Sequence, residues 1–290
     1  MNRRQILERE ERLAPYAAWC AFLVPLTFII SIGIRGQITF PDGLPTDQLP
    51  VIDLNGGPLL AATALQALSF ALMAVPLFYL FRAAQARSER VLGAMVAFTV
   101  IGPGAIAAQA VLSYLGTTQL ASDFIAEASA GGDIYTVFDD LRDDSSLLIS
   151  SSVAAQLGFL ALIVAMVYVP LQAMRVGLLT RFFATLGMAL GVITFILPVD
   201  VLQPALPLWF AWLGVIILGR APGGRPPAWE AGEAVPWPRP GEEQAEPERR
   251  PREDNGEVVE ADAQEIISPT RKDHSARRER ARKKKRKRRG

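Results

Sequence analysis

Residues 59–81 read LLAATALQALSFALMAVPLFYLF, a stretch of 23 residues without a charged side chain. A helix of about 20 apolar residues covers the roughly 30 Å hydrocarbon core of a bilayer. Five similar runs lie in the first 219 residues, so that the six occupy 15–34, 59–81, 91–115, 149–171, 182–199 and 201–219. One such run also fits a buried helix of a soluble protein. Six in one chain predict an integral membrane protein.

The spacing of the runs predicts an all-α membrane protein with six transmembrane helices over residues 15–219. The chain has 290 residues, of which 50% are hydrophobic, and these are concentrated in the runs. No small-residue cleavage site follows the first run, so we interpret it as a span and not as a cleaved signal. The last two runs are short and nearly touch, which leaves their boundary near Pro198–Pro204 open.

Arginines are distributed unequally between the two sides of the predicted spans. Cytoplasmic connections of membrane proteins are enriched in lysine and arginine. One side carries nine arginines and the other two, namely Arg3, Arg4, Arg9, Arg12, Arg82, Arg87, Arg90, Arg175 and Arg181 against Arg35 and Arg142. This asymmetry predicts that the N-terminal segment 1–14 and the C-terminal tail both lie in the cytoplasm.

The predicted spans lack the residues that most membrane-embedded chemistry needs. None of the six runs contains Asp, Glu, Lys, Arg or His, and the chain's single histidine is His274 in the tail. The spans therefore lack the histidines that histidine-held haem, histidine metal sites and Ser-His-Asp catalysis require. There is also no GxxxxGK[ST] phosphate loop. The sequence thus predicts no catalytic residue, no cofactor and no metal ligand.

The second, third and fourth predicted spans each contain one amide side chain. These amides are Gln66, Gln109 and Gln156. Such side chains often join helices by hydrogen bonds inside a bilayer, each worth about 0.6 kcal/mol. The alternative is a polar path for a small neutral solute, and the sequence leaves both interpretations open.

Glycines mark two further features of the predicted spans. Gly187 and Gly191 form a GxxxG pattern, which allows close approach of helix backbones and here favours packing within the chain. Gly102-Pro103-Gly104 predicts a kink in the third span, because proline removes a backbone donor and clashes with the preceding turn. Outside the spans, the acidic connection 116–148 predicts short helices at 120–130 and 134–141 around Gly131-Gly132.

The C-terminal tail divides into two blocks of opposite charge. Residues 220–270 are rich in Pro and Gly and then acidic, with six basic and twelve acidic side chains, whereas 271–290 hold thirteen basic and two acidic ones. Low hydrophobicity and high charge predict disorder. The basic block ends in eight consecutive cations: Arg282, Lys283, Lys284, Lys285, Arg286, Lys287, Arg288 and Arg289. Their expected target is anionic lipid, with nucleic acid or the chain's own acidic block as alternatives.

Several short segments resemble a group of small polytopic membrane proteins of high-GC bacteria that form a membrane domain of unknown function. The resemblance covers about 60 residues and rests on Thr180–Ala184 with Gly187 and Gly191, on Leu208–Phe210 with Leu213-Gly214, and on Arg225–Glu230 with Trp237-Pro238. It implies a six-span architecture and a bacterial plasma membrane, but no activity.

Taken as a whole, the sequence favours a membrane scaffold whose basic C-terminal block, residues 271–290, contacts anionic lipid or an acidic partner. The alternative function is a permease for a small neutral solute. No protein partner is indicated by any motif in the chain.

Overall fold

The computed structural model describes residues 3–129, 131, 133–196, 204–222 and 224–237. The chain divides into a unit of residues 1–240 and a second unit of residues 241–290. The basic run Arg282–Arg289 and residues 238–270 of the block that precedes it lie outside the described residues. All regular secondary structure in the described part of the first unit is helical, as the sequence predicts.

Four helices are long and apolar enough to cross a membrane. They are α1 (Arg3–Arg35), α3 (Gly56–Arg87), α4 (Val96–Ser129) and α6 (Ser146–Arg175). Their 30 to 34 residues correspond to about 45–51 Å at 1.5 Å per residue. Each therefore extends beyond a hydrocarbon core of roughly 30 Å. The first, second and fourth apolar runs of the sequence lie within α1, α3 and α6, and the third lies in α4 from Val96 onward.

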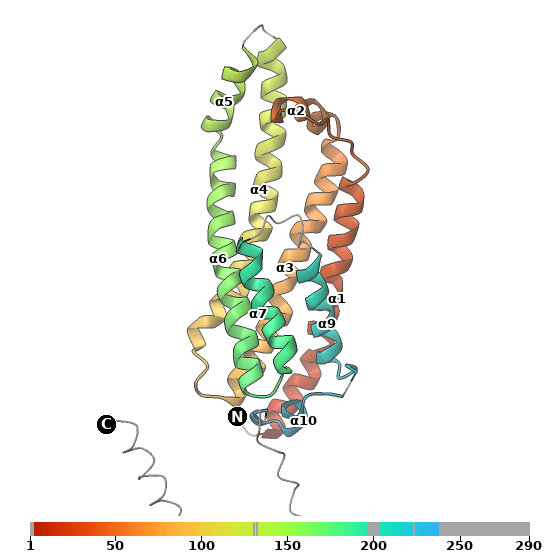
Figure 1. The fold of residues 1–290 in the computed structure, drawn as a ribbon, viewed down its shortest axis with the longest axis vertical. Helices are drawn as coiled ribbons and strands as arrows, with labels where there is room; N and C mark the ends of the chain where they lie inside the picture. Colours follow the sequence, from red (N-terminus) through yellow and green to blue (C-terminus); the bar gives the residue numbers. More distant parts are fainter. Residues whose placement is uncertain (1–2, 130, 132, 197–203, 223, 238–290) are drawn as a thin grey trace, which may run out of the picture. The chain divides into compact units, whose positions relative to one another are not determined.

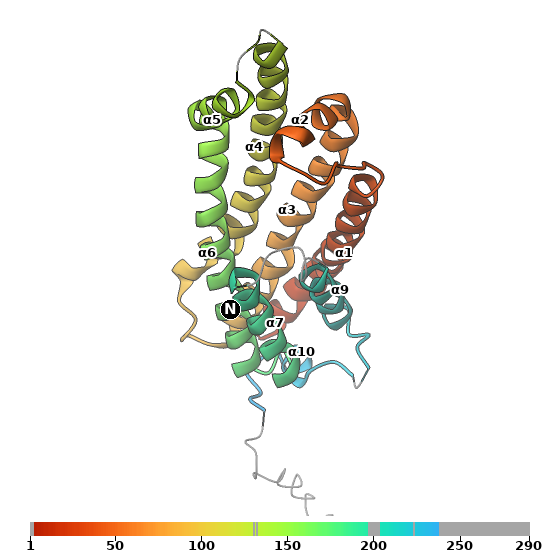
Figure 2. The same ribbon diagram turned by 45° about the horizontal axis from the view of Figure 1, so that its top comes forward.

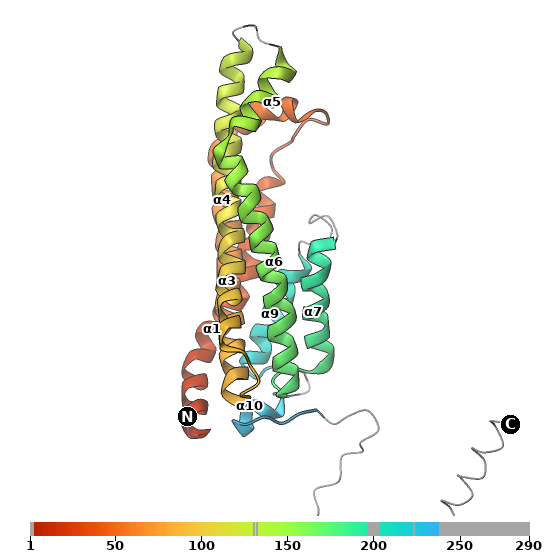
Figure 3. The same ribbon diagram turned by 90° about the vertical axis from the view of Figure 1, so that its left-hand side faces the viewer.

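The long helices form an antiparallel row in the order α1, α3, α4, α6 (Figures 1 and 2). Two shorter helices, α7 (Arg181–Ile196) and α9 (Ala205–Ile217), pack on α6 and α1, respectively. They lie beside only one half of the row, near the end where α10 is found (Figure 3). We call this end the basic end, because the arginine-rich N-terminus and the α3–α4 and α6–α7 connections lie there.

The fifth and sixth apolar runs do not form helices of spanning length in the described residues. The 16 residues of α7 and 13 of α9 correspond to about 24 and 20 Å, less than the hydrocarbon thickness. The predicted boundary between these runs falls on residues 197–203, outside the described residues, although Pro204 directly precedes α9. The structure thus supports four helices of spanning length where the sequence predicts six.

Small residues allow α7 and α9 to pack closely within the chain. A Cβ added to Gly187 would lie 2.6 Å from the Trp209 ring, and one added to Gly191 would lie 2.6 Å from Cβ of Met166. Trp209 stacks on Phe183 with 4.9 Å between ring centroids, and its indole N–H donates to the Phe183 carbonyl. The GxxxG pattern therefore serves packing within the chain, as predicted.

Residues 224–237 fold onto the basic end, which corrects the prediction of disorder from residue 220. Helix α10 (Pro227–Ala231) buries Trp229, whose side chain is 1% exposed and donates to the Leu178 carbonyl at 2.9 Å. The indole N–H of Trp237 donates to the Leu179 carbonyl at 2.8 Å. The prediction was wrong because average composition gives no weight to two isolated tryptophans that can bury a large ring and pair its N–H.

The opposite end of the unit carries a smaller core outside the four-helix row. Helix α2 (Pro45–Leu54), the last turns of α4 and α5 (Ile134–Asp144) contribute to it. Its buried members are Leu49, Leu120, Ala121 and Phe124. The predicted helix at 120–130 is thus the continuation of α4 to Ser129, and the predicted helix at 134–141 corresponds to α5. We call this the distal end.

Candidate binding pocket

A partly open pocket of about 330 Å³ lies near the distal end, between α2 and the adjoining parts of α1, α3 and α4. Its volume is near the lower limit for small-molecule sites. Polar side chains make up much of its wall, and the lining residues are Arg35, Phe40, Gln48, Ile52, Leu59, Thr63, Gln66, Gln109, Ala110, Ser113, Tyr114, Thr117 and Thr118. Figure 1 shows the elements that enclose it.

Helical spacing brings the polar side chains of α3 and α4 to this pocket. Thr63 and Gln66 are three residues apart on α3, and Gln109, Ser113 and Thr117 follow at intervals of four on α4. Side chains three or four residues apart share one face of a helix. Because α3 and α4 pack side by side, the two polar stripes line the same pocket.

Two hydrogen bonds tie the helices together at the wall of the pocket. The Arg35 guanidinium donates to Oγ1 of Thr63 at 3.2 Å and so joins α1 to α3. The Tyr114 hydroxyl donates to the Gly56 carbonyl at 2.9 Å and joins α4 to the start of α3. These bonds fix the wall of the pocket.

The side-chain amides of Gln66 and Gln109 make no hydrogen bond to any described residue, and both side chains are half-buried. Each amide offers one carbonyl acceptor and two N–H donors. The pocket therefore presents two amides whose donors and acceptors are available to water or a solute.

The charge of the pocket comes from Arg35. Among the lining residues it is the one ionised side chain at neutral pH, and no carboxylate lies in the wall. A guanidinium presents five N–H donors and matches a carboxylate well. Electrostatics in this pocket thus favour an occupant with an anionic or acceptor-rich end.

Gln156 does not join the other two glutamines. It lies on an exposed face of α6 and does not line the pocket. Helix α6 approaches α4 through other residues, since the Ser151 hydroxyl donates to the Gln109 carbonyl at 3.4 Å. The predicted path lined by all three amides is therefore reduced in the structure to a pocket lined by two.

Tightly packed apolar residues occupy the half of the bundle between this pocket and the basic end. Met73, Leu77, Ile106 and Met166 are each at most 1% exposed. Ser69 there donates its hydroxyl proton to the Val24 carbonyl at 2.8 Å and is fully buried. In the described residues we therefore find a pocket at one end and no polar route through the bundle.

Sequence reasoning missed Arg35, Tyr114 and the contribution of α2. The connection 35–58 is rich in Pro and Gly, a composition that favours turns over a helix. The spacing of Leu49 and Ile52, three residues apart, was the available indication of a helix. Tyr114 gave no indication, because its hydroxyl partner is a backbone carbonyl 58 residues earlier in the chain.

The fold and the pocket together define a class: an all-helical protein with four helices of membrane-spanning length and a polar pocket near one end. No family model matches the chain, and neither a curated protein nor a solved structure is detectably similar to it.

Proposed function

We propose that this protein lies in a bacterial plasma membrane with both termini in the cytoplasm and binds a small polar solute at its outer end. The arginine asymmetry supports this orientation, because the nine arginines flank helix ends at the basic end. In this arrangement α1, α3, α4 and α6 cross the bilayer. Helices α7 and α9 enter from the cytoplasmic side and return to it, so the number of crossings remains even.

The observation that carries the binding proposal is the convergence on one pocket of two amides from different helices, neither of them hydrogen-bonded to a described residue. Gln66 and Gln109 can each donate and accept, and Arg35 adds a positive charge. The best fit is a small solute with hydroxyl or amide groups and a carboxylate at one end. This differs from the neutral solute expected from the sequence, because Arg35 lies in the wall and no acidic side chain offsets it.

Substitution of the pocket glutamines tests this proposal. We expect Gln66→Leu and Gln109→Leu each to weaken solute binding about tenfold, since one buried hydrogen bond contributes on the order of 1–1.5 kcal/mol. The probes are amino acids, polyols and short monocarboxylates, first ranked by thermal stabilisation of the detergent-solubilised protein and then titrated calorimetrically.

Gln156→Leu is the matched control, because it removes the same amide from an exposed position outside the pocket. Binding should be unchanged in this variant. The proposal fails if none of the probes stabilises the protein, or if all three leucine variants weaken binding equally. Uptake of a bound probe into proteoliposomes would extend the proposal from a solute-binding protein to a permease, which would require the packed inner half to open.

A second candidate function is a membrane scaffold that uses the basic residues 271–290. The net charge of +11 in this block supports the proposal, because a basic residue near an anionic surface gains roughly 1 kcal/mol. A peptide of residues 241–290 should bind vesicles containing phosphatidylserine, whereas a peptide of residues 241–270 should not. Stronger binding of the longer peptide to duplex DNA than to the vesicles would favour nucleic acid instead.

A further inference from the structure

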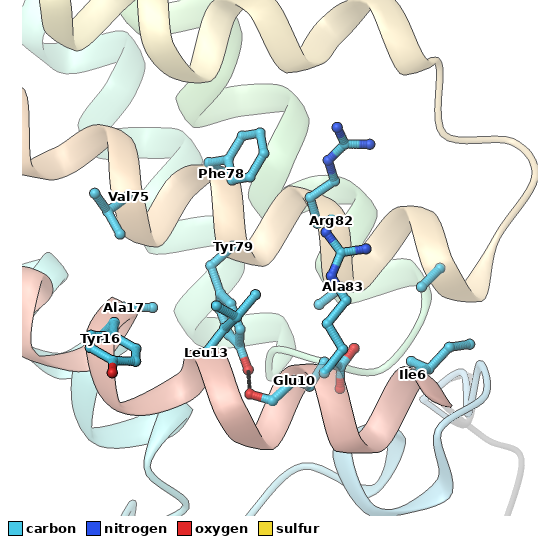
Figure 4. A pocket seen from close by; sticks show the side chains of 12 residues that line it. Ile6, Glu10, Leu13, Tyr16, Ala17, Val75, Phe78, Tyr79, Arg82 and Ala83 are labelled. Carbon is cyan, nitrogen blue, oxygen red and sulfur yellow. Dashed lines mark hydrogen bonds between the residues drawn. The ribbon is translucent and has the colours of Figure 1, made fainter. Parts of the chain in front are cut away.

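A second, mainly apolar groove lies at the basic end, between the first half of α1 and the last turns of α3. Figure 4 shows side chains of the two helices facing each other across it. The groove has a volume of about 180 Å³ and is walled mostly by carbon, including Leu13, Ala17, Val75 and Phe78. It is separate from the pocket at the distal end, because the two share no lining residue.

The groove crosses the boundary between apolar and charged sequence. The apolar run of α1 begins at residue 15, and that of α3 ends at residue 81. Tyr16, which lies just inside this boundary, lines the groove with 68% of its surface exposed. Exposed tyrosines are common at the level of the lipid headgroups. The apolar end of the groove therefore lies at acyl-chain depth, and its charged end lies among the headgroups.

Two arginines give the charged end a net positive charge. Arg9 on α1 and Arg82 on α3 line the groove and are exposed. The acidic residue among the lining side chains is Glu10, and it is already paired with Arg87, whose Nη2 lies 2.8 Å from Oε2 of Glu10. The charges of Arg9 and Arg82 thus remain uncompensated within the groove.

Contacts within α3 place Arg82 beside the apolar wall. Its guanidinium carbon lies 5.2 Å from the centre of the Phe78 ring, and Nη1 donates to Oε1 of Gln85 at 2.9 Å. A guanidinium with five N–H groups keeps further donors for a phosphate. Basic pockets between transmembrane helices on the cytoplasmic side are suited to anionic lipid headgroups.

We infer that this groove binds one anionic phospholipid of the inner leaflet, with an acyl chain along Leu13, Val75 and Phe78 and the phosphate between Arg9 and Arg82. The charge of the groove, its apolar wall and its position at the edge of the apolar runs all match this ligand. This site is independent of the solute pocket and of the basic tail, but it rests on the proposed membrane crossing of α1 and α3 with the basic end on the cytoplasmic side.

Photocrosslinking of the full-length protein in vesicles tests the inference. One vesicle population contains phosphatidylglycerol with a diazirine on its acyl chain, and the other contains phosphatidylcholine with the same label at the same mole fraction. After irradiation, labelled peptides are quantified by mass spectrometry. We expect peptides that contain residues 6–17 and 75–86 to be labelled several-fold more by the anionic lipid than by the zwitterionic one.

Removing the two charges should abolish this preference. In the Arg9→Gln/Arg82→Gln variant, labelling by phosphatidylglycerol should fall about fivefold for each arginine, the ratio expected for one basic residue beside an anionic headgroup. The Arg12→Gln/Arg90→Gln variant is the matched control, because it removes two exposed arginines that do not line the groove. Its labelling should equal that of the unmodified protein. The basic tail is present in every sample and cannot account for a difference between variants.

Two results would overturn the inference. One is equal labelling of residues 6–17 and 75–86 by the two lipids, which would show that the groove contacts bulk lipid without selecting charge. The other is an equal decrease in both double variants, which would show that the arginines act only through the overall charge of this end of the protein.

Discussion

An Arg87→Ala variant is expected to lose about 3–5 kcal/mol of stability, the cost of removing one partner of a buried ion pair. The Arg87 side chain is 0% exposed and binds both carboxylate oxygens of Glu10, whose side chain is 10% exposed. It also donates to the carbonyls of Ala83 and Ala228. It therefore joins α1, α3 and α10 at one point. Removing it leaves the Glu10 carboxylate buried without its counter-ion.

Titration with sodium dodecyl sulfate in mixed micelles would measure this loss as a lower midpoint of unfolding. Arg90→Ala serves as the control, because Arg90 is exposed three residues later and should change stability by no more than about 0.5 kcal/mol. Adding Glu10→Gln to Arg87→Ala should restore part of the loss, since it removes the stranded charge. Equal midpoints for Arg87→Ala and Arg90→Ala would contradict the structural role of this ion pair.

A Gly102→Ala variant is expected to be the most destabilising glycine-to-alanine substitution in α4. A Cβ at this position would lie 2.6 Å from the backbone nitrogen of Leu162 and 3.0 Å from the carbonyl carbon of Ala161 on α6. These are backbone atoms, which cannot rotate away as a side chain can. The two helices would have to separate, and overpacking of this kind costs about 1–3 kcal/mol or more.

Gly104→Ala provides a matched control two residues along the same helix. A Cβ at Gly104 has no neighbour within 4 Å, so this variant should be neutral or stabilised by up to about 1 kcal/mol through helix propensity. The reciprocal variant Gly158→Ala should resemble Gly102→Ala, because its Cβ would lie 2.9 Å from the Ile106 backbone nitrogen. Thermal unfolding of the three variants in detergent would rank them. Similar midpoints for Gly102→Ala and Gly104→Ala would show that α4 and α6 are not in close contact.

The Gly102-Pro103-Gly104 segment shows that a sequence motif can predict a local helix feature but not the contacts of that helix with its neighbours. The motif predicted a kink, and α4 runs as one helix from Val96 to Ser129 with Pro103 inside it. The structure gives Gly102 a further role, close approach to α6, which the motif does not reveal. The identity of a neighbouring helix is not encoded in three residues.

The candidate pocket also separates what the sequence predicts from what only the structure shows. The sequence identified Gln66 and Gln109 as polar groups in apolar helices, and both line the pocket. It also grouped Gln156 with them, although that side chain lies on an exposed face of α6. Whether two amides on different helices meet depends on the rotation of each helix about its axis. Periodicity along one helix cannot fix that rotation relative to another.

The sequence by itself determined the helical class, the four long apolar helices and the concentration of arginine at their ends. These are local properties, because transfer of about 20 residues into lipid depends on the composition of that segment alone. Tertiary structure alone decided that α7 packs on α6 and α9 on α1, that Trp229 ties α10 to the bundle and that Arg87 is paired with Glu10. Each of these depends on atoms distant in the sequence, such as those of Glu10 and Arg87, which are 77 positions apart. Burial and pairing energies exist only once such atoms are brought together.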